Sequence, residues 1–228
     1  MRRALGWLVT LVALAAVLVV GDRVAVRTAE SAAVQAFEQE AEVTGASLDI
    51  TGFPFLTQVA QGELTHVTGA AGTASFGGYT ITDLTIDARG VGISPPYPVA
   101  TGTASGLLAV DDLEQALQEQ SGLAGDLGTE GDTLVLSGTV LGLPLAVAGS
   151  PRVSDAGTLA LDVVSVDTGS GPRPVEDLPG AVADLLTGIE VSLTLPEGVA
   201  LDAVEVADGS VRITVTGTDV ALEELVAS

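Results

Sequence analysis

The chain has 228 residues; 47% of them are hydrophobic but only 3% aromatic, so a core would consist mainly of Ala, Val and Leu. Thirty acidic residues against eight basic ones, all of them Arg, give a net charge of −22, which disfavours a nucleic acid as partner. The absence of cysteine excludes disulfides and thiolate sites, and a single histidine argues against an ordinary hydrolase or metalloenzyme. We therefore expect no cofactor, no metal and no catalytic residues.

An uncharged apolar run from Ala4 to Val20 follows Arg2 and Arg3 at the N-terminus. As a helix this run would be about 25 Å long, which lies between the hydrophobic region of a signal peptide and a membrane span. A membrane anchor is favoured because the only small-residue cleavage pattern nearby, ending at Gly21, is weak. A cleaved signal peptide and a buried terminal helix remain as alternatives. With the positive charges at the start, everything after the run is expected outside the cytoplasm, in the cell envelope.

The sequence thus predicts a signal anchor or signal peptide at 1–21 and one exported α+β domain at 22–228. The residues after Arg27 contain 4 Arg and 29 acidic residues, a net charge of −25. This negative charge repels anionic surfaces, so a phosphate group would have to be held by local side chains or backbone groups. The Gly- and Pro-containing segment 168–174 is only as long as a loop, so it does not separate domains.

Residues 22–42 form a helical pattern, with small and apolar residues at spacings of three and four. From Ser47 onward the period is mostly two, as in a strongly bent antiparallel sheet. Asp208-Gly209 lies between two alternating runs and predicts a hairpin. The apolar phase slips at Val163-Val164 and Ala203-Val204, which predicts bulges. The clearest strands are expected at 83–89, 134–140, 143–148, 159–166, 199–206 and 211–215.

Three further helices are predicted among the strands. One begins at Asp111 with acidic residues in its first turn, and one spans Asp177 to Thr187 and ends at a glycine. A short third helix is expected after Asp219.

Two acidic motifs resemble functional sites. Asp167-Thr168-Gly169-Ser170 matches the sequence around an aspartic peptidase carboxylate, but such enzymes need two carboxylates and this chain has one copy. Only a symmetric dimer would supply the second, so a loop is the preferred interpretation. Asp126, Glu130 and Asp132 lack the spacing of a calcium loop and are interpreted as a solvated turn. His66 is expected on the exposed side of a strand.

The segment Gly52 to Gln58 concentrates aromatic residues around a proline, which forces an extended or turned backbone. Two interpretations remain open. Phe53, Phe55 and Leu56 form either a turn packed into the core or the apolar mouth or membrane-facing tip of a lipid site.

This segment, together with Leu193 to Val199 and Thr216 to Leu222, resembles the recurrent landmarks of the actinobacterial lipomannan elongation factor family. The resemblance extends from about Asp22 to Leu225. It implies an exported, membrane-associated phospholipid-binding protein with a curved antiparallel sheet wrapped around a long helix, as in tubular lipid-binding domains. It also implies a link to phosphatidylinositol-type lipids and lipid-linked glycans, and it supplies no catalytic residues.

The leading hypothesis is a non-enzymatic envelope protein that holds a phospholipid in an elongated apolar cavity lined by small side chains. Arg152 and Arg173, both next to prolines, are the candidate partners of a lipid phosphate. The alternative is a scaffolding module that docks onto an unidentified protein through its sheet edge or the segment Phe53 to Leu56.

Overall fold

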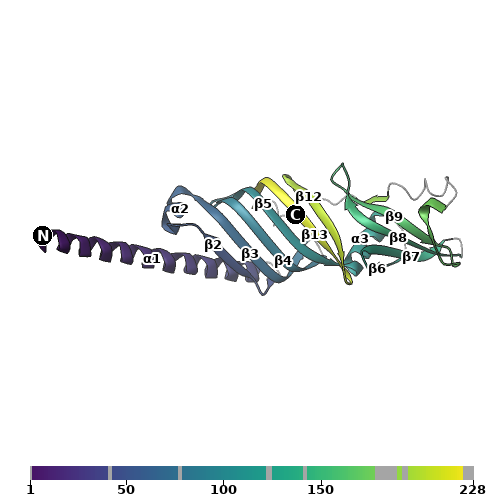
Figure 1. Ribbon diagram of the computed structural model, residues 1–228, viewed down its shortest axis with the longest axis horizontal. Coiled ribbons are helices and arrows are strands. Elements are labelled where there is room, and N and C mark those ends of the chain that lie inside the picture. Colours follow the sequence, from purple (N-terminus) through teal and green to yellow (C-terminus); the bar gives the residue numbers. More distant parts are fainter. Residues whose placement is uncertain are drawn as a thin grey trace.

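The computed structural model describes residues 2–40, 43–76, 79–121, 125–140, 143–177, 189–191 and 195–222. This part of the chain is mostly antiparallel sheet with few helices. The molecule is elongated, and α1 (Arg2–Glu40) projects from one end of it (Figure 1).

The first sheet contains the strands that flank the middle of the sequence. Its members, in spatial order, are β1 (Val43–Thr44), β3 (Glu63–Phe76), β4 (Tyr79–Gly92), β5 (Pro98–Ala109), β13 (Ser210–Ala221) and β12 (Val199–Ala207), with β2 (Ser47–Thr51) also paired to β3. The C-terminal hairpin therefore returns to complete the sheet that the N-terminal strands begin.

The intervening chain forms a second sheet, whereas the sequence had suggested a single curved one. Its order is β10 (Pro172–Pro174), β9 (Leu159–Asp167), β8 (Leu143–Val153), β7 (Thr133–Val140) and β6 (Asp126–Glu130), with β11 (Ile189–Val191) also paired to β9. The chain leaves the first sheet through α3 (Val110–Ser121), and β13 takes the edge of β5 that is thereby left open.

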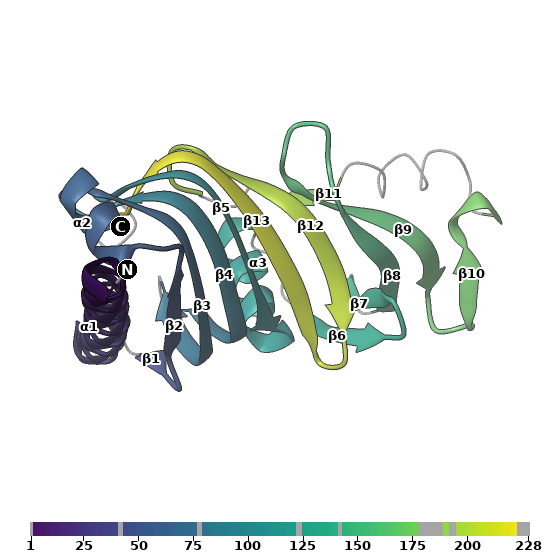
Figure 2. The same ribbon diagram turned by 60° about the vertical axis from the view of Figure 1, so that its left-hand side comes forward.

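The predicted hairpin and bulges are confirmed. Ala207 pairs with Ser210 across a two-residue turn in which Gly209 has φ 66°. The registers shift between Leu201 and Ala203 and, in the second sheet, opposite Val164. Bulges increase local twist, and the long strands curve strongly in Figure 2.

The helix predicted at Asp111 is confirmed as α3, but its acidic residues have a second role. Asp112 accepts a hydrogen bond from the Thr80 backbone N–H (3.0 Å), and Glu114 accepts one from that of Leu127 (2.9 Å). These bonds connect α3 to one strand of each sheet.

The other two helix predictions have different outcomes. The helix expected after Asp219 does not begin before Leu222, because β13 continues to pair with β5 up to Ala221, and residues 223–228 lie outside the described residues. The helix predicted from Asp177 lies outside the described residues, except that Asp177 ends the short 3-10 helix η1 (Val175–Asp177).

One hydrophobic cluster joins α3 to both sheets. Leu113 and Val211 are its most buried members, at 2% and 1% exposure. Its other buried residues are Val110, Leu127, Leu134, Leu159, Leu201 and Val204.

A second, smaller cluster holds α1. Val26 packs with Ile50 of β2 and with Phe55 of α2 (Phe55–Gln61). Helix α1 thus contacts β1, β2 and α2 at one edge of an open sheet, where we had expected a sheet wrapped around it. Among the described residues, no helix is both long and apolar enough to cross a membrane.

Candidate functional site

The segment Gly52 to Gln58 builds α2, a helix that the sequence interpretation missed. Pro54 stands at the N-cap position with extended backbone (ψ 140°), and the helix begins at Phe55. No side chain of the segment itself caps the helix. Instead, Asp22 of α1, only 3% exposed, accepts a hydrogen bond from the Leu56 N–H at 2.9 Å. A carboxylate is favoured at this end of a helix because the first N–H groups have no partner within it.

Gln58 attaches α2 to the sheet. Its side chain is buried, accepts a hydrogen bond from the Thr65 N–H (2.7 Å) and donates one to the Thr51 carbonyl (3.5 Å). Gly52 allows this arrangement, because its φ is +103° and a Cβ there would lie 2.8 Å from Nε2 of Gln58. The family landmark in this segment therefore has a structural explanation.

The three predicted tip residues divide into two environments. Phe55 is 6% exposed and belongs to the cluster with Val26, so it packs in the core and is not part of the surface. Phe53 and Leu56 are 57% and 52% exposed. The core interpretation therefore applies to Phe55 and not to Phe53 and Leu56, and binding of lipid by this segment stays a prediction.

Arg23 lies beside this surface. Its Cζ is 5.9 Å from the centre of the Phe53 ring, within the range of a cation–π interaction. Sequence reasoning missed it because residues 1–27 were set aside with the N-terminal apolar run. The spacing of Arg23 and Arg27, one helical turn apart, was the available signal.

The two Arg residues predicted to bind phosphate lie elsewhere. Arg152 is in β8, where Nε donates to Asp162 Oδ1 at 2.8 Å, and Arg173 is exposed in β10. Both are in strands, not in the loops expected next to prolines. Their partners on β9, Ala160 and Val166, are roughly 20 Å apart along the strand. The second sheet is also at the opposite end of the molecule from α2 (Figure 1). The structure does not bring these predicted residues into one site.

The first sheet has an inner face, defined here as the face that packs against α1 and α3. One cross-strand row on it contains Leu48, Gly69, Ile86, Ala104, Val215 and Leu201. The next row contains Ile50, Val67, Ala88, Gly102, Gly217 and Val199. Residues paired across strands share a face, so all twelve residues of these two adjacent rows are apolar or glycine.

The centre of the inner face is less covered than its ends. Leu48 packs against the α1 cluster and Leu201 belongs to the α3 cluster, whereas Ile86, between them, is 42% exposed. At Gly69 and Gly102, the three atoms nearest to an added Cβ belong to the same sheet and lie at 3.5–3.9 Å. A strip of small apolar residues thus crosses the middle strands, and we call this strip the inner trough.

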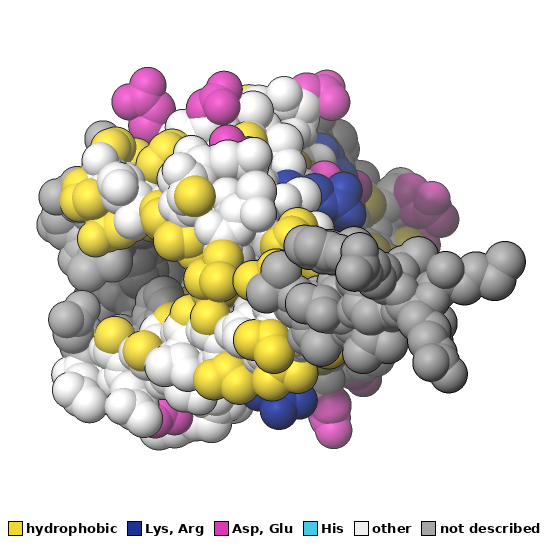
Figure 3. All heavy atoms as spheres, turned by 90° about the vertical axis from the view of Figure 1, so that its left-hand side faces the viewer, with side chains coloured by type: hydrophobic (Ala, Val, Ile, Leu, Met, Phe, Trp, Pro, Cys, Tyr) yellow, Lys and Arg dark blue, Asp and Glu magenta, His cyan; other side chains and the backbone are white. Residues whose placement is uncertain are grey.

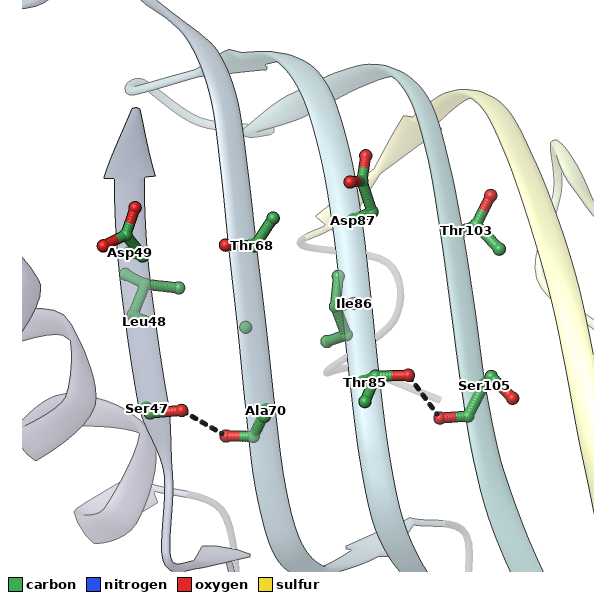
Figure 4. A pocket seen from close by; sticks show the side chains of 11 residues that line it. Ser47, Leu48, Asp49, Thr68, Ala70, Thr85, Ile86, Asp87, Thr103 and Ser105 are labelled. Atoms are coloured by element: carbon green, nitrogen blue, oxygen red, sulfur yellow. Dashed lines mark hydrogen bonds between the residues drawn. The ribbon is translucent and has the colours of Figure 1, made fainter. Parts of the chain in front are cut away.

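The opposite, outer face carries a hollow of about 600 Å³, lined by polar side chains and by parts of Leu48, Gly69, Ala70 and Ile86. Figure 4 shows two rows of side chains over it, Asp49 to Thr103 and Ser47 to Ser105. A second hollow, of about 300 Å³, lies at Glu197 and Asp219. Hydroxyl and carboxylate side chains contribute to the lining of both, so neither is the elongated apolar cavity that the sequence predicts.

His66 lies on the outer face of β3, as predicted. Its Nδ1 is 3.0 Å from Oγ1 of Thr51, and its Nε2 is 2.9 Å from Oδ2 of Asp87. A hydroxyl, an imidazole and a carboxylate in this order resemble a hydrolytic triad, but the carboxylate of a triad is buried, and the Asp87 side chain is 50% exposed. We interpret these contacts as a connection between β2, β3 and β4.

The peptidase-like motif is a turn. Asp167 Oδ1 accepts hydrogen bonds from the backbone N–H groups of Gly169 (2.8 Å) and Gly171 (2.9 Å). This carboxylate therefore closes its own loop. No group of three metal-ligating side chains occurs within the part of the chain that the structure describes, the turn at Asp126 to Asp132 included.

Comparison with known proteins agrees with the resemblance seen in the sequence. Neither the curated proteins nor the solved structures contain a match to this chain. The sequence pattern of one protein family, described as LmeA-like phospholipid-binding, matches residues 20–216 and thus most of the chain. The chain belongs to the LmeA-like phospholipid-binding family.

Proposed function

We propose that this protein is a non-enzymatic component of the cell envelope that holds a phospholipid with its acyl chains in the inner trough. The observation that supports it best is the pair of cross-strand rows made only of apolar residues and glycine, with Ile86 exposed at their centre. Membership of a phospholipid-binding family supports the same ligand class.

The energetics are favourable. Each buried methylene of an acyl chain contributes about 0.8 kcal/mol, so roughly ten of them contribute about 8 kcal/mol before the entropic terms of association. The lipid would be a membrane phospholipid, with phosphatidylinositol types among the candidates. The protein would support assembly or transport of envelope glycolipids such as lipomannan.

We also propose that the chain is exported and remains attached to the membrane through Ala4 to Val20. The motivation is the length of the apolar run and the weak cleavage pattern at Gly21. N-terminal sequencing of the mature protein tests this. A first residue of Asp22 would contradict an anchor and indicate a cleaved signal.

Native mass spectrometry of the full chain, purified from a lipid-containing host, tests lipid binding. We expect a co-purifying phospholipid at about one per chain. A protein that stays empty and co-purifies with a tightly bound protein partner would contradict the proposal and favour the scaffolding alternative.

A further inference from the structure

One exposed side of α2 and the residue before its N-cap carry apolar side chains, next to the exposed Thr57 and Gln61. Phe53, Leu56 and Val59 are 57%, 52% and 37% exposed, whereas Phe55 and Gln58 between them point into the protein. Leu56 and Val59 are three residues apart and share one side of the helix. Together with Arg23 and Arg27 of α1, these residues form what we call the α1–α2 corner.

This corner lies where α1 leaves the rest of the molecule (Figure 1). Asp22 is bonded to Leu56 of α2, and Val20 is only two residues before it, about 3 Å along the helix axis. The four successive residues Val17, Leu18, Val19 and Val20 cover one full turn of α1 and are 68%, 63%, 43% and 63% exposed. A helix that is apolar on all sides is suited to burial in lipid or protein, so whatever surrounds it also reaches α2.

The charges near the corner favour an anionic surface. Half of the basic residues of the chain belong to α1, and Arg23 and Arg27 are exposed in its folded part. Asp22 and Glu30, the acids nearest to them on α1, keep their charge but are turned toward the protein, where they accept the N–H groups of Leu56 and Ile50. In Figure 3, which faces this end of the molecule, hydrophobic side chains gather over the middle of the face, and Arg side chains lie beside them with Asp and Glu farther out or next to the Arg groups.

We propose that the α1–α2 corner docks onto a bilayer containing anionic phospholipid, with Phe53, Leu56 and Val59 in the interface and Arg23 and Arg27 at the phosphates. A bilayer is the occupant, and not a protein, because the same apolar surface continues along the projecting helix. The strongly acidic remainder of the chain would be repelled by such a surface, so the corner also sets the orientation. This inference rests on the proposed function for the lipid class and names the surface through which the protein meets it.

The chain has no cysteine, so a single one can be introduced and labelled with a fluorophore. Leu56→Cys places the label at the corner, and Thr168→Cys places a control label in an exposed turn of the second sheet. The full chain is reconstituted into vesicles of phosphatidylcholine, either alone or with about 30% phosphatidylglycerol. The second lipid gives the vesicle the negative surface charge that would attract Arg side chains. Quenching by iodide in water and by a spin-labelled lipid is then measured.

We expect the Leu56 label to be shielded from iodide and quenched by the lipid probe in the anionic vesicles, and the Thr168 label to stay accessible to iodide. Arg23→Gln with Arg27→Gln should lower the docked to undocked ratio about 30-fold, the usual effect of two basic residues at an anionic surface. Arg89→Gln with Arg212→Gln removes the same charge from the outer face and should change the ratio little.

Equal iodide access of the two labels in anionic vesicles would overturn the proposal, as would equal effects of the two Arg pairs. Lipid retention in the native mass spectrum is a separate readout. If the protein retains lipid but the Leu56 label is accessible to iodide, only the docking proposal is rejected. If the label is shielded but the protein holds no lipid, only the proposal of lipid binding in the inner trough is rejected.

Discussion

The two faces of the first sheet come from alternate residues of the same strands and differ in almost every property. Leu48, Gly69, Ile86 and Ala104 form a row on the inner face, and their direct neighbours in sequence, Asp49, Thr68, Asp87 and Thr103, form a row on the outer face. One side offers small apolar groups and the other hydroxyls and carboxylates.

This difference indicates which face suits which ligand. An acyl chain over the outer face would bury hydroxyl groups without partners, at a cost of about 1–3 kcal/mol for each. Over the inner face it would only replace water at apolar surface. The outer hollow is the more obvious depression, yet the inner trough is the better place for a lipid.

The largest expected effect is at the end of the inner face, where α1 and α2 close it. Phe55→Ala should lower the free energy of unfolding by roughly 3–5 kcal/mol, because it removes a buried aromatic side chain. Phe53→Ala, two residues away and exposed, should change it by less than about 0.5 kcal/mol. Urea denaturation measures both. Similar losses in the two variants would show that this part of the core is assigned wrongly.

The next largest effect distinguishes the two faces by how a bulky substitution on each changes lipid binding. Gly102→Leu should displace about three methylenes of an acyl chain from the inner trough, about 2.4 kcal/mol or roughly 50-fold in Kd. Its backbone is not in the left-handed region, so the substitution adds no strain there. Thr103→Leu places the same side chain on the outer face and should leave binding unchanged. Bound phospholipid per chain is the measurement, and equal losses would place the lipid elsewhere.

A smaller effect concerns the attachment of α1 to the inner face. Asp22→Asn keeps the shape of the side chain but weakens its hydrogen bond to the first turn of α2. We expect a loss of about 1.5 kcal/mol in the free energy of unfolding. Asp49→Asn, on the exposed outer face, is the matched control and should have almost no effect. A stability unchanged by Asp22→Asn would mean that α1 is held by its apolar contacts alone.

The smallest effect is expected on the outer face itself. His66→Gln removes an exposed contact with Asp87, and such pairs contribute at most about 1 kcal/mol. Lipid binding should not change. If bound lipid instead decreased tenfold in a folded variant, the outer hollow would be the ligand site and the comparison of the faces would be reversed.

Local patterns in the sequence predicted much of the fold. Alternation predicted the strands that became β4, β7, β9 and β12, and the phase slips predicted the bulges in β9 and β12. These features depend on neighbouring residues along the chain, where the side-chain period is two. The family resemblance, carried by three short landmarks, was likewise available from sequence alone.

The sequence failed where a residue's role depends on a distant partner. The same segment contains a buried Phe55 and an exposed Phe53, and only the packing of Val26 against β2 and α2 distinguishes them. Arg152 and Arg173 looked equivalent in sequence, but β9 separates them.

By itself, the sequence determined the strand-rich class, the acidic surface and the family, because composition and period-two alternation require no knowledge of tertiary contacts. The tertiary structure decided how the strands divide into two sheets and which face of the first sheet is left uncovered at Ile86. It also placed Arg23 beside Phe53. The physical reason is that pairing between β5 and β13, about a hundred residues apart, and the docking of α1 on α2 are long-range contacts. Their free energy comes from surfaces that exist only once the chain has folded.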